Sequence, residues 1–186
     1  MNKGIKIILC SIGALALLVV VAFFILGHFF RKSLEIKIDP EKYSAIVQTR
    51  AGWSKNYEFL PEEIPTDAVK IAFFHVPGFL QGSDIISLRL TLPSESIDAL
   101  VKELAGSDRE EISDVSGLGA YAYPPYGMKK PEPNSTFEEV SELPDDFRIF
   151  LYKCNLKDLE EHRSPNILSF TAVSTKRNEV VYYIDY

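Results

Sequence analysis

An unbroken apolar run near the start of the chain constrains this protein more than any other feature of its sequence. Residues 7–30 form 24 positions without a charged side chain, and sixteen of them are Leu, Ile, Val or Phe. At about 1.5 Å of rise per residue, a helix of this length spans roughly 36 Å, enough to cross a hydrocarbon core of about 30 Å. A buried helix of a soluble protein is seldom so apolar on every side. The run therefore predicts a transmembrane helix over residues 7–30.

This run is longer than the apolar part of a cleaved secretory signal, which has about 7–15 residues. Its last residues, 25–30, also lack the small-residue pattern of a cleavage site. Basic residues flank both ends, so counting them favours neither orientation. Long domains cross membranes largely regardless of charge, whereas moving Lys3 and Lys6 across would be costly. We expect a permanent single-pass anchor in the cell membrane, with the N-terminus inside and the domain outside the cytoplasm.

Residues 1–32 are thus predicted to be a membrane anchor, and residues 33–186 are long enough for one soluble domain with its own core. This second region holds 16 basic and 26 acidic residues, a net charge of −10. Such a surface repels nucleic acid and suits a basic protein partner, although acidic residues can also serve solubility alone. Its single cysteine, Cys154, excludes an internal disulfide and a cysteine-based metal site.

The apolar pattern of the soluble region predicts an α+β domain. Five segments have the composition or alternation of β-strands, namely residues 69–76, 85–92, 147–154, 167–174 and 180–186. The main helix follows the second strand, where Ile97, Leu100, Val101 and Leu104 recur at helical spacing, with Ser94 or Ser96 as the cap. We expect a two-layer fold with a mostly antiparallel sheet of about five strands and this helix on one face.

Several shorter elements are also predicted. Asp39 caps and Pro40 opens a helix near the start of the domain, and Trp53, just beyond it, is expected to anchor the following connection onto the core. Residues 107–110 and 155–162 have the sequence of short capped helical turns, and Thr136 with Glu139 forms a capping box that opens a short helix ending before Pro144.

One histidine carries the only signal for catalysis. His75 lies at the end of the first predicted strand, just before a Pro-Gly break, where a structural histidine is the more common finding. Paired with a nearby carboxylate, Asp84 or Glu63, it could serve a small membrane-tethered hydrolase. The chain lacks the nucleophile-elbow, zinc-protease and phosphate-loop motifs, so the sequence favours a binding protein over an enzyme and predicts no cofactor.

An acidic cluster follows the main helix at Asp108, Glu110, Glu111 and Asp114. Four carboxylates could gather around a divalent cation, but their spacing matches no EF-hand loop and Arg109 in their midst opposes a cation. We interpret the cluster as a solvated charged face and predict no metal site.

A tyrosine-rich stretch is the best candidate for a partner surface. Tyr121, Tyr123 and Tyr126 lie within a long segment rich in Gly and Pro, residues 116–134. Long loops in compact domains are often functional, and tyrosine gives contact area at low entropic cost. The alternative is a loop that folds onto the body of the domain through these same tyrosines.

A resemblance enters through a set of short strings. They are Phe59-Leu60-Pro61, Ile64-Pro65, Ala68, Pro77-Gly78-Phe79-Leu80-Gln81-Gly82 and Leu88-Arg89. Together they resemble uncharacterised bacterial membrane-anchored proteins in which these pieces recur, a resemblance that implies no function. Phe79 and Leu80 either cover the core or protrude as an apolar patch, and an exposed patch would mark a binding site.

The sequence thus favours a single-pass bacterial membrane protein whose acidic domain binds another protein or an envelope component, for example as an inhibitor or immunity-type protein. A tethered hydrolase using His75 is the first alternative. A scaffold for a membrane assembly is the second.

Overall fold

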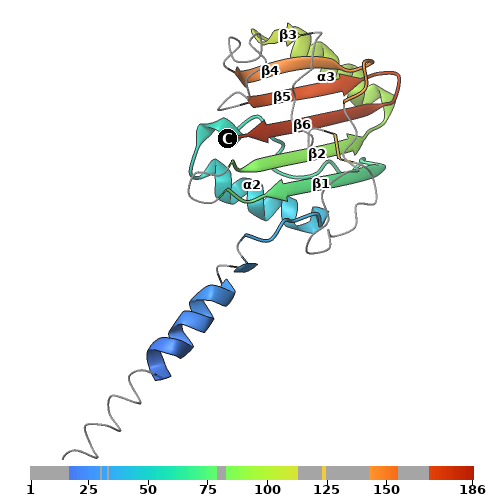
Figure 1. The fold of residues 1–186 in the computed structure, drawn as a ribbon. Coiled ribbons are helices and arrows are strands. Elements are labelled where there is room, and N and C mark those ends of the chain that lie inside the picture. The colour runs from blue at the N-terminus through green and yellow to red at the C-terminus, as the bar shows by residue number, and fades with distance from the viewer. Residues whose placement is uncertain are drawn as a thin grey trace, which may run out of the picture. The chain divides into compact units, whose positions relative to one another are not determined.

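The chain divides into two compact units, Met1–Glu35 and Ile36–Tyr186. A computed structural model describes residues 17–29, 31–32, 34–78, 83–112, 123–124, 143–154 and 168–186 of the chain. Both units are drawn in Figure 1.

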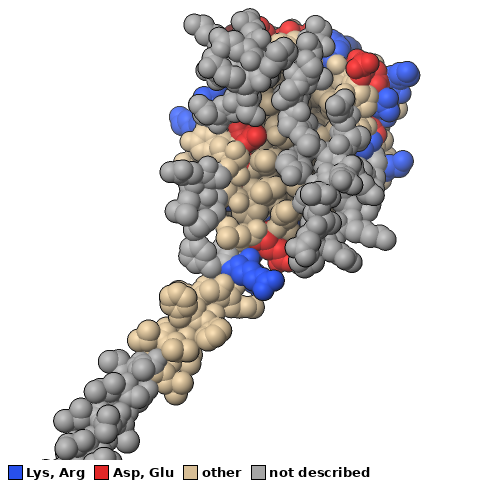
Figure 2. Space-filling model, viewed as in Figure 1, with Lys and Arg blue, Asp and Glu red and all other residues tan. Residues whose placement is uncertain are grey.

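In the first unit, residues 17–29 are helical and their large apolar side chains are exposed. The exposed fraction runs from 45% at Val21 to 79% at Phe23. The helix is tan throughout in Figure 2, because none of these residues is charged. Among the helices of the described residues, none combines the length and the apolar character needed to cross a membrane. Residues 7–16 and 30 of the predicted transmembrane helix lie outside the described residues.

The second unit is built on one antiparallel sheet of six strands in the order β1-β2-β6-β5-β4-β3 (Figure 1). The strands are β1 (Lys70–Val76), β2 (Ile85–Thr91), β3 (Glu110–Ile112), β4 (Arg148–Cys154), β5 (Leu168–Ser174) and β6 (Glu179–Asp185). The predicted α+β class with an antiparallel sheet is confirmed. The predicted number of about five strands was one too low, because β3 was not recognised.

Two hairpins join strands that are consecutive in the chain. Strands β1 and β2 pair with Phe73 opposite Leu88, and strands β5 and β6 pair with Ala172 opposite Val181. Asn178 in the β5–β6 turn has φ +55°, a left-handed conformation that Asn adopts more readily than most residues.

The helices are a 3₁₀ turn η1 (Pro40–Lys42), α2 (Tyr43–Ala51), a second 3₁₀ turn η2 (Lys55–Tyr57) and α3 (Ser94–Ala105). Asp39 caps η1 as predicted, because its side chain accepts a hydrogen bond from the Glu41 amide at 3.1 Å. The predicted serine cap of α3 is wrong. Pro93 occupies the cap position, and the Ser96 hydroxyl instead donates to Asp67 at 2.7 Å.

One face of the sheet packs against both α-helices. Tyr43 of α2 and Ile97 and Leu104 of α3 are fully buried in this core, which spans the sheet from β1 to β4. The strand residues of this face are Phe73, Ile86, Leu88, Leu90, Phe150, Val173, Val180, Tyr182 and Ile184. Ile86, Leu88 and Leu90, at alternate positions of β2, therefore all point into this core.

The opposite face of the sheet is also buried over its centre. Phe170 and Tyr183 stack there at 5.1 Å between ring centroids, and Tyr123, Leu143 and Phe147 pack onto the same cluster. Alternation of apolar and polar residues, as in β2, is typical of a strand with one solvated face, yet Ser87 on the polar side is 0% exposed. Alternating polarity reported the direction of the side chains correctly but not their exposure.

Two other local predictions are wrong. Trp53 is 72% exposed, and the buried Tyr57 and Leu60 anchor the connection instead. Residues 107–110 do not form a capped helical turn, because Glu110 begins β3, where pairing with β4 outweighs the local capping pattern. The capping box predicted at residues 136–139 and the turn predicted at residues 155–162 lie outside the described residues.

Candidate functional site

The side chains of His75 and Asp84 meet in the second unit, as the hydrolase hypothesis required. Asp84 lies just before β2, and its Oδ1 is 3.1 Å from His75 Nε2 at the end of β1. Both residues are buried, since Asp84 is 6% exposed and His75 is 4% exposed. Glu63, the other carboxylate considered, is exposed, and no hydrogen bond joins it to His75 among the described residues.

Asp84 also receives three other hydrogen bonds. Arg50 of α2 donates to Oδ1 at 2.8 Å, Tyr57 of η2 donates to Oδ2 at 2.7 Å, and the Gly78 amide donates to Oδ1 at 3.0 Å. The backbone of Asp84 pairs with that of Tyr186 beyond β6. The Asp84 carboxylate therefore connects α2, η2 and both ends of the β1–β2 connection, and the Asp84 backbone adds the residue that follows β6. We call these side chains the Asp84 cluster, comprising Arg50, Tyr57, His75 and Asp84.

The charge of Asp84 is stabilised by these donors. Burial alone would raise its pKa, but the hydrogen bonds from His75, Gly78 and Tyr57 hold the pKa of this carboxyl below its ordinary value. Because an ionised carboxylate can only accept, His75 Nε2 carries the proton of this contact. Burial and the bond to Asp84 raise the pKa of the Tyr57 hydroxyl above its ordinary range, which keeps it a donor.

This arrangement fits a structural role better than a catalytic one. A catalytic histidine held by an aspartate presents its second ring nitrogen to a nucleophile or to substrate. His75 Nδ1 is buried and has no hydrogen-bond partner among the described residues. Both oxygens of Asp84 are already occupied. The hydrogen bonds of the cluster fasten separate elements together, and within the described residues no hydroxyl or thiol group is hydrogen-bonded to His75 Nδ1.

A second buried ion pair lies on the opposite face of the sheet. Arg89 of β2 donates twice to Glu179 of β6, at 2.9 and 3.2 Å. Tyr123 donates to the same carboxylate at 2.6 Å, and the Arg89 guanidinium lies 3.8 Å from the centre of its ring. Arg89 also donates to the Pro124 carbonyl at 3.1 Å. These contacts fasten Tyr123 and Pro124 to the sheet.

Of the predicted binding residues, only Tyr123 lies in the described part of the chain, and it is 5% exposed. Tyr121, Tyr126, Phe79 and Leu80 lie outside the described residues, so a partner surface formed by them stays a prediction. The acidic cluster after α3 is partly accounted for, because Glu111 forms a two-pronged ion pair with Arg148 at 2.7 and 2.9 Å. Asp114 also lies outside the described residues.

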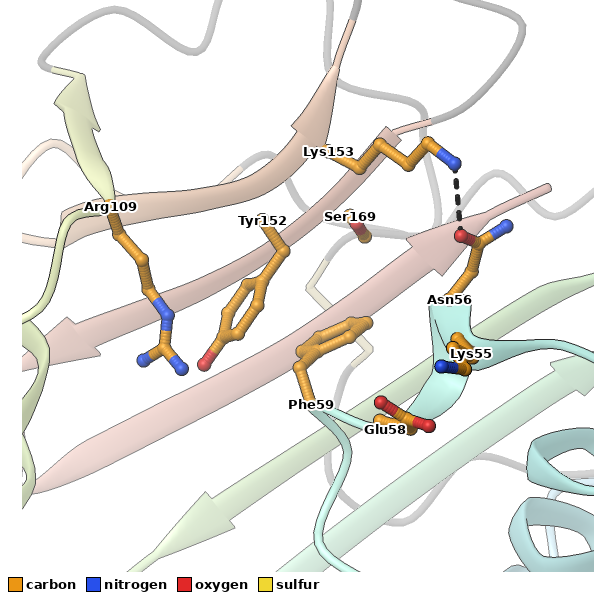
Figure 3. A pocket seen from close by; sticks show the side chains of 8 residues that line it. All are labelled: Lys55, Asn56, Glu58, Phe59, Arg109, Tyr152, Lys153 and Ser169. Carbon is orange, nitrogen blue, oxygen red and sulfur yellow. Dashed lines mark hydrogen bonds between the residues drawn. The ribbon is translucent and has the colours of Figure 1, made fainter.

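A hollow of about 310 Å³ opens between η2, β4 and β5 (Figure 3). We call it the Tyr152 hollow. It is lined by Lys55, Asn56, Glu58, Phe59, Arg109, Tyr152, Lys153 and Ser169. The rings of Phe59 and Tyr152 lie 4.2 Å apart between centroids, and the Arg109 guanidinium lies 4.0 Å from the centre of the Tyr152 ring. In Figure 3, Arg109 stands on one side of the aromatic pair, and Lys55 and Lys153 stand on the other.

An irregularity in β4 shapes this hollow. Leu151 pairs with Phe170 and Lys153 pairs with Ser169, so Tyr152 is an extra residue without a partner in β5. In a regular strand, neighbouring side chains point to opposite faces. Here Tyr152 and Lys153 both line the same hollow, as expected where two residues of a bulge oppose one residue of the next strand. Bulges are frequent beside functional sites because they redirect a side chain in this way.

The hollow contains more positive than negative charge. Lys55, Arg109 and Lys153 line it together with one carboxylate, that of Glu58. Lys153 donates to the neutral Asn56 side chain at 3.0 Å. In the described part of the chain, none of these three cations forms an ion pair with a carboxylate, unlike Arg50, Arg89, Arg148 and Arg177.

Comparison with known protein families, with curated proteins and with solved structures gives no match to this chain. The site must therefore be interpreted from its own geometry.

Sequence reasoning missed the Tyr152 hollow. Phe147–Cys154 was correctly predicted as a strand, but no signal in these residues marks Tyr152 as the extra one. The lining cations come from three separate segments, at residues 55, 109 and 153, which only the sheet topology brings together. Arg109 was noted as a residue that opposes cation binding, and that observation was the one available hint.

Proposed function

We propose that this chain is a single-pass membrane-anchored binding protein, whose acidic domain faces away from the cytoplasm and recognises a protein or another component of the envelope. An inhibitor or immunity-type protein is the form of this function that we favour. The observation that carries the proposal is the exposed apolar surface of residues 17–29. Phe23 and Phe24 are 79% and 76% exposed, which is costly in water and favourable in lipid.

The sequence around this helix supports the same interpretation. Residues 17–29 are the second part of a charge-free run that begins at residue 7. On an insertion scale, its Leu, Ile, Val and Phe residues contribute about −0.3 to −0.6 kcal/mol each. No charged residue within the run opposes insertion.

The polar clusters of the domain support binding over catalysis. Across the described residues, the His75–Asp84 pair has no nucleophile at hydrogen-bond distance, and its donors serve to join separate elements. A rigid sheet that carries recognition surfaces on its loops is a common design for binding domains.

Membrane fractionation tests the anchor. The full chain should sediment with membranes and stay there under an alkaline carbonate wash. A Val20→Lys, Phe24→Lys double variant should shift toward the soluble fraction, because each central lysine costs about 2.5–3.5 kcal/mol on insertion. Lys42→Gln, a substitution at an exposed residue of the domain, is the control and should remain in membranes. Wild-type chain found in the soluble fraction would refute the proposal.

Crosslinking in intact cells tests the partner. A bound protein or envelope component should be captured with the full chain, and Tyr121→Ala with Tyr126→Ala should reduce its capture. Tyr123 is a poor probe, because its substitution also removes the bond to Glu179. Equal capture by the wild type and the double variant would exclude the tyrosine segment as the partner surface.

A further inference from the structure

The Tyr152 hollow has the chemistry of an anion site, which is unexpected in a domain with ten more acidic than basic residues. We propose that it binds a small organic anion, one that carries a carboxylate or phosphate group on a planar apolar body. The inference concerns the second unit alone and does not depend on the membrane anchor.

The first argument is charge. Three cations face one carboxylate in the hollow, a local excess of two positive charges. Elsewhere in the domain, four arginines each have a carboxylate partner, and the shortest such contacts are 2.7 to 2.9 Å. Like charges that outnumber their counter-charges repel one another, and an anion that enters reduces this repulsion. The hollow is therefore suited to a negatively charged ligand.

The second argument is the way the cations are held. The Arg109 guanidinium lies against the face of Tyr152, an arrangement that fixes the plane of the guanidinium and leaves its N–H edges available to an anion. Lys153 extends from β4 to Asn56 of η2 and is positioned by that hydrogen bond. Side chains already held in place lose less conformational freedom when a ligand binds.

The third argument is the apolar surface beside these charges. The Phe59 ring is only partly buried and lies against Tyr152, with an angle of 33° between the ring planes. Burial raises the pKa of the Tyr152 hydroxyl, so this ring stays neutral and adds no negative charge to the hollow. A planar group fits beside such rings, and its acidic substituent can then reach Lys55, Lys153 or Arg109.

Size limits the ligand. A cavity of about 310 Å³ lies at the lower end of the roughly 300–1,000 Å³ typical of small-molecule sites. Stable protein partners instead bury about 800 Å² on each side. A ligand with one ring and one acidic group matches the space and the charge, whereas a protein surface would need contacts well outside the hollow.

Calorimetric titration of the full chain in a zwitterionic detergent tests the proposal, with phenyl phosphate and benzoate as probes. At least one of these anions should bind, and benzyl alcohol, which is of similar size but neutral, should not. Inorganic phosphate should bind at least tenfold more weakly than phenyl phosphate, because it lacks the apolar body. Benzyl alcohol or inorganic phosphate binding as tightly as the best aromatic anion would overturn the proposal, as would no binding of either anion at millimolar concentration.

Variants locate the binding. Arg109→Gln and Lys153→Gln should each lower the affinity for the aromatic anion by about tenfold, the usual effect of losing one charge-assisted hydrogen bond. Lys176→Gln is the matched control, because Lys176 is an exposed lysine in the turn at the far end of β5. Circular dichroism establishes that each variant is folded, and Lys55→Gln provides a third probe if one of the others is not. Equal loss of affinity in Lys176→Gln and the folded hollow variants would refute the site.

Discussion

The Asp84 cluster and the Tyr152 hollow are two polar regions of one domain with opposite balances of charge. In the cluster, a single buried carboxylate accepts four hydrogen bonds from Arg50, Tyr57, His75 and Gly78. In the hollow, three cations share the surroundings of one carboxylate and stay partly open to solvent. Polar groups that satisfy one another hold a fold together, whereas groups left unsatisfied retain the capacity to bind something else.

The substitution expected to lower the free energy of unfolding most is one in the Asp84 cluster. Asp84→Ala removes the common acceptor of all four donors and leaves the Arg50 charge partly buried without its partner. Loss of one member of a buried ion pair typically costs about 3–5 kcal/mol. Urea unfolding followed by circular dichroism measures this change.

Asp145→Ala is the control for that variant, because it removes an exposed carboxylate of the same type. It should change the free energy of unfolding by less than about 0.5 kcal/mol. If both variants unfold at the same urea concentration, the Asp84 cluster does not stabilise the fold.

A smaller loss of stability is expected when a buried carboxylate loses one hydrogen-bond donor and keeps the others. Tyr123→Phe removes one hydrogen bond to Glu179 but leaves both bonds from Arg89 in place. Hydrogen bonds to charged groups are worth about 1.5–3 kcal/mol, so the loss should fall in this range and below that of Asp84→Ala. The same unfolding measurement applies. A change below about 0.5 kcal/mol would mean that Tyr123 does not fasten its segment to the sheet.

The sequence predicted the parts of this fold that have a local cause. Alternation in β2 and helical spacing in α3 are properties of neighbouring residues, and both elements were found where expected. Strand β3 has only three residues, two of them Glu, and it exists because it pairs with β4. No local pattern of the chain could have revealed it.

The Asp84 cluster and the Tyr152 hollow also differ in how much of each could be predicted from local sequence. The approach of His75 to Asp84 was foreseeable because the β1–β2 hairpin brings its own ends together. The role of the pair was not, because Arg50 and Tyr57 come from elements that the hairpin does not determine. The Tyr152 hollow depends on a register shift and on three distant segments, so it required the assembled sheet.

The dependence of stability on pH gives a third, smaller effect. The pKa of Asp84 is lower in the folded state than its ordinary value of 3.8, so its contribution is complete above that value and is lost as pH falls toward the folded pKa. From pH 7 to pH 4 the loss should stay below about 1 kcal/mol and should grow at lower pH. Glu111 and Asp146 have lowered pKa values too, so the wild type alone does not isolate Asp84.

Asp84→Asn isolates the contribution of the Asp84 charge to the pH dependence of stability, because this variant cannot ionise at position 84. The difference in unfolding free energy between the wild type and Asp84→Asn should shrink as pH falls from 5 to 3. A difference that stays constant over this interval would show that the carboxylate charge of Asp84 is not what stabilises the cluster.

The smallest effect on stability is expected in the hollow, and it is the sharpest test of the comparison. Lys153→Gln removes an exposed cation that, within the described part of the chain, has the neutral Asn56 as its side-chain partner. The lost hydrogen bond is offset by weaker repulsion from Lys55 and Arg109, so the free energy of unfolding should change by less than about 0.5 kcal/mol.

Arg89→Gln is the matched variant, because it replaces a cation by the same neutral residue where Glu179 lies buried opposite. Arg89→Gln should destabilise the fold several times more, by up to about 3–5 kcal/mol, since Glu179 would keep its charge but lose both hydrogen bonds from Arg89. A cost for Lys153→Gln as large as that for Arg89→Gln would mean that the cations of the hollow are structural, and the distinction between the two regions would then fail. A small cost, together with a loss of anion binding in the same variant, would separate the residues that hold this domain together from those that are free to recognise a ligand.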